Sequence, residues 1–455
     1  MIDSPLAGVL ACPRCDVALA RIADAWHCKG CSTNYPELDG VPFVFAEPGV
    51  ALDEWRQRYH ARLRDIEQHM AALEQSLSPT SLIAPTRERL SHELDALGSH
   101  REDLNTLLSA LDMTHMAADH ATYLAMRTRL PSDQGLITYY ANLHRDWCWG
   151  ETENAQSKTL VAAAIGEDGP GRLLVLGAGG GRLAYDLHQH YSHPLTVALD
   201  FNPLLMLAAD KLARGDALAL HEFPLAPRSA REVAVSRTLR APTPAREGLH
   251  WILANALRAP FKPNSFDTLL TPWLVDVVDE PLSVQAARWN QLLPVGGRWI
   301  WFGSHVFRAA DPVERLGIEE SMAIIELAGF DKPTIVEAEI PYMASPANRH
   351  ARQERVIVMS MTKTADVERP KRHVALPDWL VQGDLPVPSS ESFKTQAMTT
   401  RIQAFFFSMI DGQRTLEDMA LLMEQERLMP KDEGIATLRN FLIRALEEGE
   451  GYHTF

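Results

Sequence analysis

Three things are scarce in this sequence: long apolar runs, cysteine and positive charge. No apolar run reaches the roughly 20 residues that a membrane-spanning helix needs, and residues 1–15 lack the basic start and apolar core of a secretory signal. Lys and Arg number 44 against 59 Asp and Glu, and the resulting net charge of −15 disfavours a general nucleic-acid surface. We therefore expect a cytoplasmic protein with no membrane partner.

Cysteine is almost confined to the amino-terminal region, where two CxxC pairs occur. Cys12 and Cys15 form the first pair, and Cys28 and Cys31 follow after twelve intervening residues. Two such pairs offer four thiolates to one tetrahedral zinc ion, and a closed four-cysteine set leaves no position for catalysis. Two disulfides or a redox CxxC are the alternatives, and a cytosolic setting disfavours disulfides. We predict a structural Zn²⁺ site with His27 as a bystander.

The chain is too long for a single core. Its 455 residues are 46% hydrophobic and 23% charged, which is ordinary for a soluble protein, and no internal repeat is visible. We expect about three or four domains. The pattern divides into residues 1–50, a helical region over 51–135, a central domain over 136–364, and a linker with a small domain over 365–455.

The stretch from Arg172 to Asp200 is typical of the first half of a nucleotide-binding βαβ unit. The short apolar run Leu173–Leu176 suits a strand that is buried on both faces of a parallel sheet. A helix is expected over Leu183–His188 and a second strand over Thr196–Leu199. Asp200 ends that second strand, where a carboxylate can accept hydrogen bonds from both hydroxyls of a ribose.

Between the first strand and the helix lie Gly177, Gly179 and Gly181. Glycine is needed there because the backbone must turn tightly and let a ligand come close. A dinucleotide fold requires G-x-G-x-x-G, whose last glycine falls on residue 182, but that residue is Arg182. The G-x-G-x-G pattern favours S-adenosylmethionine over NAD, because S-adenosylmethionine has no pyrophosphate that the loop must hold. The alternative is an ordinary glycine turn in another α/β protein.

Polar residues are also expected at the carboxyl ends of later strands, where ligands of open α/β sheets bind. Asn255 and Ala256 follow the strand Trp251–Leu253, where a side-chain amide and a backbone N–H can read an adenine edge. Asp276 follows the strand Phe266–Leu270. A fifth strand, Arg298–Phe302, precedes His305, and a closing hairpin is expected over 332–341 and 353–361, next to Tyr342.

Just before the glycine stretch, helical spacing places Asn142 near Arg145. An arginine with the aromatic neighbours Tyr139 and Trp147 can hold the carboxylate of a ligand. A surface arginine beside a buried tryptophan is the alternative, and the lone Cys148 is expected to be a buried thiol.

A long insertion, residues 221–248, interrupts the central domain and carries five arginines. Such a connection is either functional or disordered, so a substrate lid and a solvated loop both remain open.

Four pieces in order resemble carnosine N-methyltransferase and its relatives: Arg145-Asp146-Trp147, the loop LGAGGGRLAYDL, the stretch 266–276 and the strand that ends near Gly303. The resemblance covers residues 136–362. It implies an α/β fold with a Rossmann-like seven-stranded class I methyltransferase sheet, S-adenosylmethionine as cofactor, and methylation of an imidazole nitrogen of a histidyl dipeptide.

The resemblance also assigns roles residue by residue. The resemblance assigns cofactor binding to six residues, of which Asn142, Asp200, Asn255 and Ala256 differ in type from the family: Asn142, Arg145, Gly177, Asp200, Asn255 and Ala256. The loop itself adds Gly179 and Gly181 to the expected cofactor site. Asp276 would hydrogen-bond the acceptor imidazole; a helix cap is its alternative role. The family histidine aligns with Arg308 beside His305, and a family tyrosine aligns with Gln353, so the acceptor need not be carnosine. We assign catalytic roles to Asp276, His305 and Tyr342.

Two flanking regions resemble other families. Residues 8–46, with the text Asn34-Tyr35-Pro36-Glu37-Leu38-Asp39-Gly40, resemble the zinc ribbon of the activator subunit of tRNA and protein methyltransferases. Residues 411–419 resemble the winged-helix-like peptide chaperone of pyrroloquinoline quinone biosynthesis. A peptide-binding module and a helical cap are both open for this small, mainly helical domain.

The sequence therefore predicts an S-adenosylmethionine-dependent N-methyltransferase that acts on an imidazole nitrogen of a small histidine-derived molecule or peptide. A protein or tRNA methyltransferase with a fused ribbon, and a non-catalytic S-adenosylmethionine- or peptide-binding module, are the alternatives. The sequence does not indicate the oligomeric state.

Overall fold

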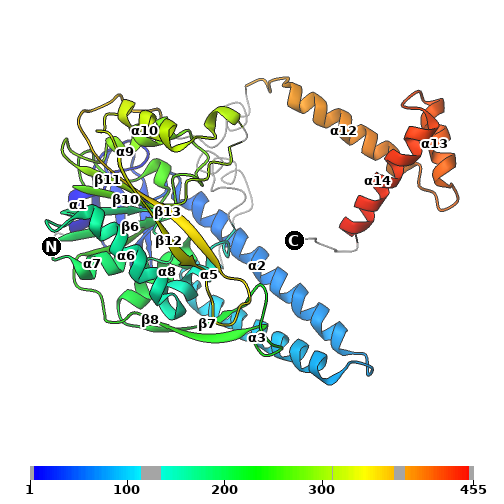
Figure 1. Ribbon diagram of the computed structural model, residues 1–455, viewed down its shortest axis with the longest axis horizontal. Coiled ribbons are helices and arrows are strands. Elements are labelled where there is room, and N and C mark those ends of the chain that lie inside the picture. The colour runs from blue at the N-terminus through cyan, green and yellow to red at the C-terminus, as the bar shows by residue number, and fades with distance from the viewer. Residues whose placement is uncertain (1–4, 114–134, 310, 373–384, 450–455) are drawn as a thin grey trace. The chain divides into compact units, whose positions relative to one another are not determined.

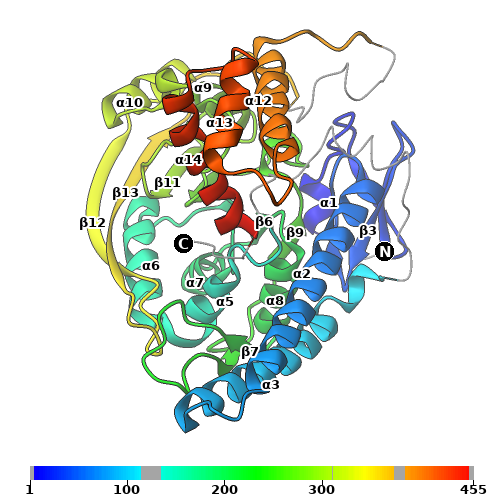
Figure 2. The same cartoon turned by 90° about the vertical axis from the view of Figure 1, so that its right-hand side faces the viewer.

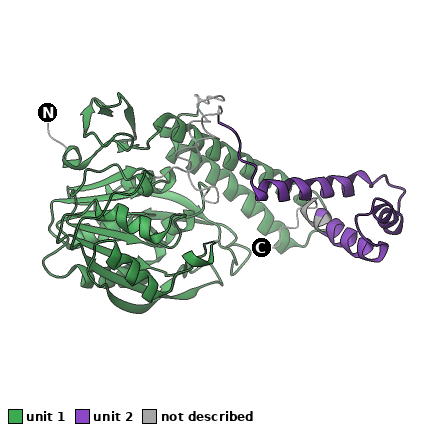
Figure 3. Cartoon of the chain, turned by 90° about the horizontal axis from the view of Figure 1, so that it is seen from above, with its two compact units in different colours: residues 1–377 green, residues 378–455 purple. Residues whose placement is uncertain are grey.

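The computed structural model describes residues 5–113, 135–309, 311–372 and 385–449 (Figure 1). The chain forms two compact units, residues 1–377 and 378–455 (Figure 3). The finer division at residues 50, 135 and 364 stays a prediction. Among the helices of the described ranges, none is both long enough and apolar enough to span a bilayer.

The first unit begins with a small antiparallel sheet that follows helix α1 (Pro5–Val9). Its strands pair in the order β1-β2-β3-β4. The strands are β1 (Leu19–Ile22), β2 (Ala25–Cys28), β3 (Asn34–Leu38) and β4 (Val41–Pro42). Trp26 and Tyr35 are fully buried in this ribbon. A module of this size has little core of its own, so its contacts with the large sheet matter for its stability.

The large sheet has seven strands in the order β12-β13-β11-β10-β5-β6-β9. Strand β13 runs antiparallel to both of its neighbours, and the pairings of β11, β10, β5, β6 and β9 are parallel. This architecture confirms the predicted Rossmann-like class I methyltransferase sheet. The strands are β5 (Arg172–Leu176), β6 (Leu195–Asp200), β9 (Leu249–Leu253), β10 (Thr268–Pro272), β11 (Arg298–Gly303), β12 (Thr334–Tyr342) and β13 (Arg352–Thr362).

The strand order defines where a ligand can bind. From β5 the chain moves outward to β6 and β9, then returns to β10 on the other side of β5. The carboxyl ends of β5 and β10 therefore border the switch point, the crevice in which open α/β sheets bind their ligands. Leu274 after β10 already meets the β5 loop there, because a Cβ on Gly177 would lie 3.0 Å from its Cδ1.

Alternate side chains of β5 build two separate cores, as expected for a strand buried on both faces. Leu173 and Val175 face the helices of one layer, and Leu174 and Leu176 face the other layer and the ribbon. The first layer contains α6 (Glu151–Ile165), α7 (Arg182–His190) and α8 (Pro203–Ala213), and the second contains α9 (Leu282–Asn290) and α10 (Ile318–Leu327).

The predicted helical region is a helical pair, α2 (Pro48–Leu77) and α3 (Ala84–Leu107), followed by the short helix η1 (Ser109–Leu111). Trp55, Tyr59 and Ile66 recur at helical spacing along α2 and are buried, and Leu63 between them is partly buried. Helix α3 packs against α8 and β7 (Figure 2). The pair thus belongs to the first helical layer. The rest of the region, residues 114–134, lies outside the described residues.

The insertion at 221–248 contains a folded arm, built on strands β7 (Ala217–Glu222) and β8 (Val235–Arg240). His92 of α3 donates from Nε2 to the carbonyl of Ala234 at 2.8 Å, and Asn348 accepts from the backbone N–H of Ala226 at 2.9 Å. These contacts hold the arm against α3 and the β12–β13 turn. The solvated-loop interpretation is therefore wrong, because the insertion includes a paired strand and is anchored at Ala234 and Ala226; the lid role stays a prediction.

The second unit is described as three helices, which confirms the mainly helical prediction. They are α12 (Glu391–Ser408), α13 (Leu416–Gln425) and α14 (Lys431–Gly449). Phe406, Met419 and Met423 lie in their small core, and a capping box of Thr415 and Asp418 starts α13. No strand occurs between residues 385 and 449, so a wing is not part of what is described.

Candidate active site

The glycine loop after β5 adopts the conformation that its sequence requires. Gly177, Gly179 and Gly181 have φ angles of 72°, 57° and 87°, in the left-handed region that favours glycine. A Cβ on Gly181 would lie 2.6 Å from the Trp251 ring, so no larger residue fits. A Cβ on Gly179 would meet nothing within 4 Å, so the loop presents its backbone to open space there.

Asp200 ties the end of β6 to this loop. Its Oδ2 accepts a hydrogen bond from the Gly179 N–H at 2.9 Å, and its Oδ1 accepts one from the Asn202 N–H at 3.0 Å. Burial raises the pKa of Asp200 to about 6, although the N–H groups of Asn202 and Gly179 oppose this shift. The carboxylate thus lies beside the loop at the switch point, as the sequence predicts.

Arg145 lies in a buried charged cluster and is not a surface residue. It belongs to the π-helix η3 (Arg145–Trp149) that follows α5 (Tyr140–His144). Its guanidinium pairs with Asp146 at 2.7 Å and with Glu153 at 3.0 Å. Burial disfavours its charge, but the two carboxylates raise the pKa of Arg145. The surface-arginine interpretation is therefore wrong, and so is the expected burial of Cys148, which is exposed.

The segment from Asn142 to Trp147 packs directly on the glycine loop. Trp147 donates from Nε1 to the carbonyl of Gly180 at 2.7 Å. A Cβ on Gly180 would lie 2.3 Å from Oδ2 of Asp146 and 3.5 Å from the carbonyl oxygen of Asn142. The structure therefore brings the backbone of Asn142 to the loop, together with Asp146, the ion-pair partner of Arg145.

Arg182 is a positioning residue that the sequence interpretation missed. Its Nη1 donates to the carbonyl of Asp146 at 2.8 Å, its Nε donates to Asp186 at 2.9 Å, and its guanidinium lies 5.6 Å from the Trp147 ring centroid. It fastens η3 to α7 from the place where a dinucleotide fold has its third glycine. The signal in the sequence was the arginine at this glycine position, which we interpreted only as evidence against NAD.

Asn255 and Ala256 lie at the carboxyl end of β9, half-buried. The Asn255 Oδ1 accepts from the N–H of Leu257 at 2.9 Å and caps the short helix η4 (Ala256–Arg258). The amide nitrogen of Asn255 has no partner among the described residues. If Asn255 binds the adenine edge as predicted, the hydrogen bonds come from this amide nitrogen and from the backbone.

Asp276 lies beyond β10, across the switch point from the glycine loop. Its Oδ2 accepts hydrogen bonds from the Ser304 hydroxyl at 2.7 Å and the Val306 N–H at 2.8 Å. Its Oδ1 is buried and has no hydrogen-bond partner in the described structure. Helix α9 begins at Leu282 after Pro281, so the helix-cap interpretation of Asp276 is wrong. A buried acceptor without a donor is costly unless a ligand supplies one.

Tyr342 ends β12 beside the same crevice. Its ring centroid lies 4.9 Å from that of Trp273, which follows β10 with φ 53°, and Arg352 lies 4.4 Å over its ring. Burial raises the pKa of Tyr342, while the charge of Arg145 opposes the shift. The neighbouring Met343 donates its N–H to Glu153 at 2.9 Å. Tyr342 is thus linked both to the Arg145 cluster and to the β10 end.

His305 faces a different set of partners. Its Nε2 hydrogen-bonds the Ser321 hydroxyl of α10 at 2.9 Å, and its ring stacks on Trp301 with centroids 5.2 Å apart. Burial lowers the pKa of His305 and so disfavours the charged imidazolium form. The structure thus ties His305 to α10; its catalytic role stays a prediction.

The four amino-terminal cysteines converge on one point. Their Sγ atoms all lie within 4.8 Å of one another, and the closest pairs, Cys12–Cys31 and Cys15–Cys28, are 3.5 and 3.3 Å apart. A disulfide requires about 2.0 Å, so the four thiols are free. Tetrahedral zinc with bonds of about 2.3 Å separates its sulfurs by about 3.8 Å. His27 hydrogen-bonds Asn34 outside this cluster.

The ribbon docks along the β9 edge of the large sheet. The Val44 N–H donates to the carbonyl of Leu253 at 2.8 Å, and Phe43 forms a parallel bridge with Leu253. The Ala11 N–H donates to the carbonyl of Pro260 at 2.8 Å. The four-cysteine module therefore covers an edge strand that would otherwise expose unpaired backbone groups.

Comparisons with known proteins complete the description. No family model and no curated protein matches the sequence. Solved structures with a similar fold include a possible histamine N-methyltransferase from Thermotoga maritima, with 16% identity over 50% of this chain and 99% of that one, TM-score 0.32. The N-methyltransferase NodS of Bradyrhizobium japonicum is 11% identical over 48% of this chain and 97% of its own, TM-score 0.32. A phosphoethanolamine N-methyltransferase of Haemonchus contortus, solved with S-adenosylhomocysteine, is 11% identical over 55% and 61%, TM-score 0.33.

Proposed function

We propose that this protein is an S-adenosylmethionine-dependent N-methyltransferase with a structural zinc ribbon in the same chain. The observation that carries the proposal is the glycine loop held by Asp200 at the switch point. Gly179 faces open space, Asp146, the ion-pair partner of Arg145, contacts the loop at Gly180, and the orphaned Oδ1 of Asp276 lies beyond the neighbouring strand. These groups would suit a cofactor that carries a ribose and a carboxylate, with Asp276 left to bind the acceptor.

The residues divide the work between holding the cofactor and orienting the acceptor. Bound S-adenosylmethionine supplies an electrophilic methyl group. Asp200 would hold the ribose hydroxyls and Arg145 the methionine carboxylate, while Asn255 and Ala256 flank the adenine. Methyl transfer needs a lone pair in line with the methyl group, so orientation of the acceptor supplies much of the rate.

For the acceptor, we infer an imidazole of a small histidine-derived molecule or peptide. Asp276 would accept the N–H of one ring nitrogen on its unpartnered Oδ1 and so leave the other nitrogen unprotonated toward the methyl group. Ser304 and Val306 fix the carboxylate by binding its other oxygen. Tyr342 and Trp273 would form an aromatic wall beside it.

A second candidate, a protein methyltransferase, is favoured by the docking of the ribbon beside η4. The experiment that separates the two uses methyl-labelled S-adenosylmethionine with separate pools of histidine-containing small molecules, peptides and intact proteins. Mass spectrometry should find the label on imidazole nitrogen in the first two pools. Label only on intact proteins would favour the second candidate, and cofactor binding without transfer would favour a binding module.

Removing the Asp200 carboxylate should weaken cofactor binding. Asp200→Ala is expected to cost about 1–3 kcal/mol of binding free energy for S-adenosylhomocysteine, because the ribose hydroxyls of the ligand lose a charged hydrogen-bond acceptor. Calorimetry measures the change. Asp216→Ala makes the same charge change at an exposed site after α8 and is the control. Equal affinities for the two variants would remove Asp200 from the cofactor site.

The raised pKa of Asp200 predicts a pH dependence with opposite signs for stability and binding. The folded protein has a pKa of about 6 at this group, against an ordinary value of 3.8. The protonated form therefore contributes stability below the unfolded pKa, and that contribution is lost as the pH rises through about 6. Cofactor affinity should instead fall, by up to about tenfold per pH unit, as the pH drops below about 6, because only the carboxylate accepts both hydroxyls.

Calorimetric titrations on either side of that pKa test this prediction. Asp200→Asn should bind the cofactor more weakly than the parent but with a flatter pH profile. A parent protein whose affinity does not change through the same pH range would contradict the assignment of Asp200 to the ribose.

A further inference from the structure

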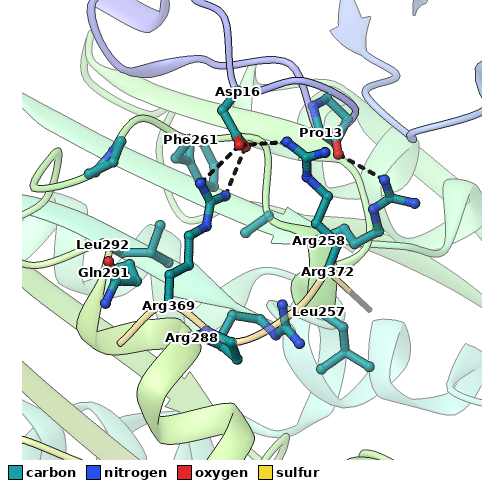
Figure 4. A pocket seen from close by; sticks show the side chains of 13 residues that line it. Pro13, Asp16, Leu257, Arg258, Phe261, Arg288, Gln291, Leu292, Arg369 and Arg372 are labelled. Carbon is teal, nitrogen blue, oxygen red and sulfur yellow. Dashed lines mark hydrogen bonds and ion pairs between the residues drawn. The ribbon is translucent and has the colours of Figure 1, made fainter. Parts of the chain in front are cut away.

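A polar pocket lies away from the switch point (Figure 4). It is lined by the segment around the first CxxC pair, by η4, by α9 and by residues 369–372. Figure 4 shows guanidinium groups from three parts of the chain gathered around it. Leu257, Phe261 and Leu292 supply apolar lining. Its charged lining consists of Arg258, Arg288, Arg369, Arg372 and Asp16.

Nearby carboxylates neutralise only part of this positive charge. Asp16 accepts two hydrogen bonds from Arg369, both at 2.8 Å, and one from Arg372 at 2.6 Å. Arg288 pairs with Glu280 at 2.6 Å, outside the lining. Within the described part of the chain, two carboxylates thus pair with three of the four guanidinium groups. Glu47, the other acidic residue near Arg258, is paired with Arg14 at 3.5 Å.

Among the described residues, Arg258 is the lining guanidinium that forms no ion pair with a carboxylate. Its Nη2 donates to the carbonyl of Pro13 at 3.0 Å, and its Nε is buried with no hydrogen-bond partner in the described structure. Burial and the nearby charge of Arg372 lower the pKa of Arg258, which shows that its surroundings disfavour the cation. A buried donor and an excess of positive charge are both satisfied by an anion.

We propose that this pocket binds the phosphate group of a small phosphorylated ligand. Guanidinium forks match the oxygens of phosphate in geometry, and their charge strengthens each hydrogen bond. The apolar residues around Arg258 favour a single group over an extended chain. A nucleic acid would meet the net charge of −15 along the rest of the surface, which opposes its approach.

Asp16 makes the proposal testable in both directions. It competes with the anion for Arg369 and Arg372, so removing its charge should strengthen phosphate binding, whereas removing the arginines should weaken it. Asp16 has φ 64°, a conformation that asparagine adopts as readily as aspartate, so Asp16→Asn preserves the backbone. Arg369 and Arg372 are about half exposed, so their replacement by glutamine leaves the core intact.

The experiment titrates zinc-loaded full-length protein with inorganic phosphate and with glycerol 3-phosphate at constant ionic strength, by calorimetry. The double variant Arg369→Gln, Arg372→Gln is expected to lose about tenfold or more in affinity, since two charge-assisted contacts disappear. Asp16→Asn should gain severalfold. Arg355→Gln is the control, because Arg355 forms an exposed pair with Glu339 on the β12–β13 hairpin.

Tighter binding of glycerol 3-phosphate than of inorganic phosphate identifies a phosphorylated molecule as the ligand, and the reverse order identifies the free ion as the source of the same chemistry. Three results overturn the proposal. They are no phosphate binding by the parent, equal affinities in the double variant and in Arg355→Gln, and weaker binding in Asp16→Asn, which would mean that the arginines only tether residues 369–372. A single-stranded oligonucleotide that binds far more tightly than either probe, through the same arginines, would assign the pocket to nucleic acid instead.

Discussion

Asp276→Asn is expected to lose most methyl transfer while it retains the fold and the affinity for the cofactor. The Val306 N–H requires an acceptor, so the amide oxygen should take the Oδ2 position and the NH₂ the Oδ1 position. That exchange places an N–H donor where the N–H of the substrate imidazole needs a hydrogen-bond acceptor. The amide therefore selects the wrong tautomer of the ring. We expect turnover to fall by about a hundredfold or more, as for the buried aspartate of serine proteases in a similar substitution.

The readouts are turnover on the identified acceptor, calorimetric cofactor affinity and the melting temperature. Ser304→Ala is the matched control, because it removes one of the two donors to Oδ2 and leaves the carboxylate itself in place; a loss of about tenfold or less is expected. Asp276→Asn turnover within a few-fold of the parent would show that Asp276 is structural and would remove the main support for an imidazole acceptor.

The largest effect on stability is expected from loss of the metal. Cys28 is fully buried, and its Sγ lies inside the four-thiol cluster. Cys28→Ser, or removal of zinc with a chelator, should unfold the ribbon, because a structural zinc site supplies folding free energy of about 10 kcal/mol or more in isolated modules. The β9 edge would then lose its cover at Leu253, and solubility should fall.

Metal analysis should find one zinc per parent chain, and thermal unfolding should report the loss in Cys28→Ser. Cys148→Ser is the control, since Cys148 is exposed and outside the cluster, and it should match the parent in zinc content and melting temperature. A protein without zinc whose thiols are oxidised in pairs would contradict the zinc assignment.

The sheet was predictable because its pattern is local. Leu173–Leu176 is apolar throughout, as a doubly buried strand must be, and the structure extends it only to Arg172. The loop glycines and Asp200 carry their roles in residue type and spacing. The strand predicted over Phe266–Leu270 is found two residues later, at Thr268–Pro272. Asp267, just before it, pairs with Arg172 at the amino ends of the two central strands β10 and β5.

The missed features depend on contacts between distant residues, which no local pattern reports. Arg182 acts through Asp146, 36 positions away, and the folded arm at 221–248 is held by His92 and Asn348. The arginine pocket joins Asp16 to Arg369, which are 353 positions apart. In the sequence, the two residues of such a pair look like ordinary charged surface residues, because only the fold brings them together.

The most direct test of the central claim is a pair of calorimetric titrations of the zinc-loaded parent protein, one with S-adenosylmethionine and one with NAD. The cofactor assignment predicts one S-adenosylmethionine site per chain, since Asp200 binds a single glycine loop at Gly179. It predicts no binding of NAD, since Arg182 takes the place of the glycine that a dinucleotide needs. Tight binding of NAD with none of S-adenosylmethionine would contradict it.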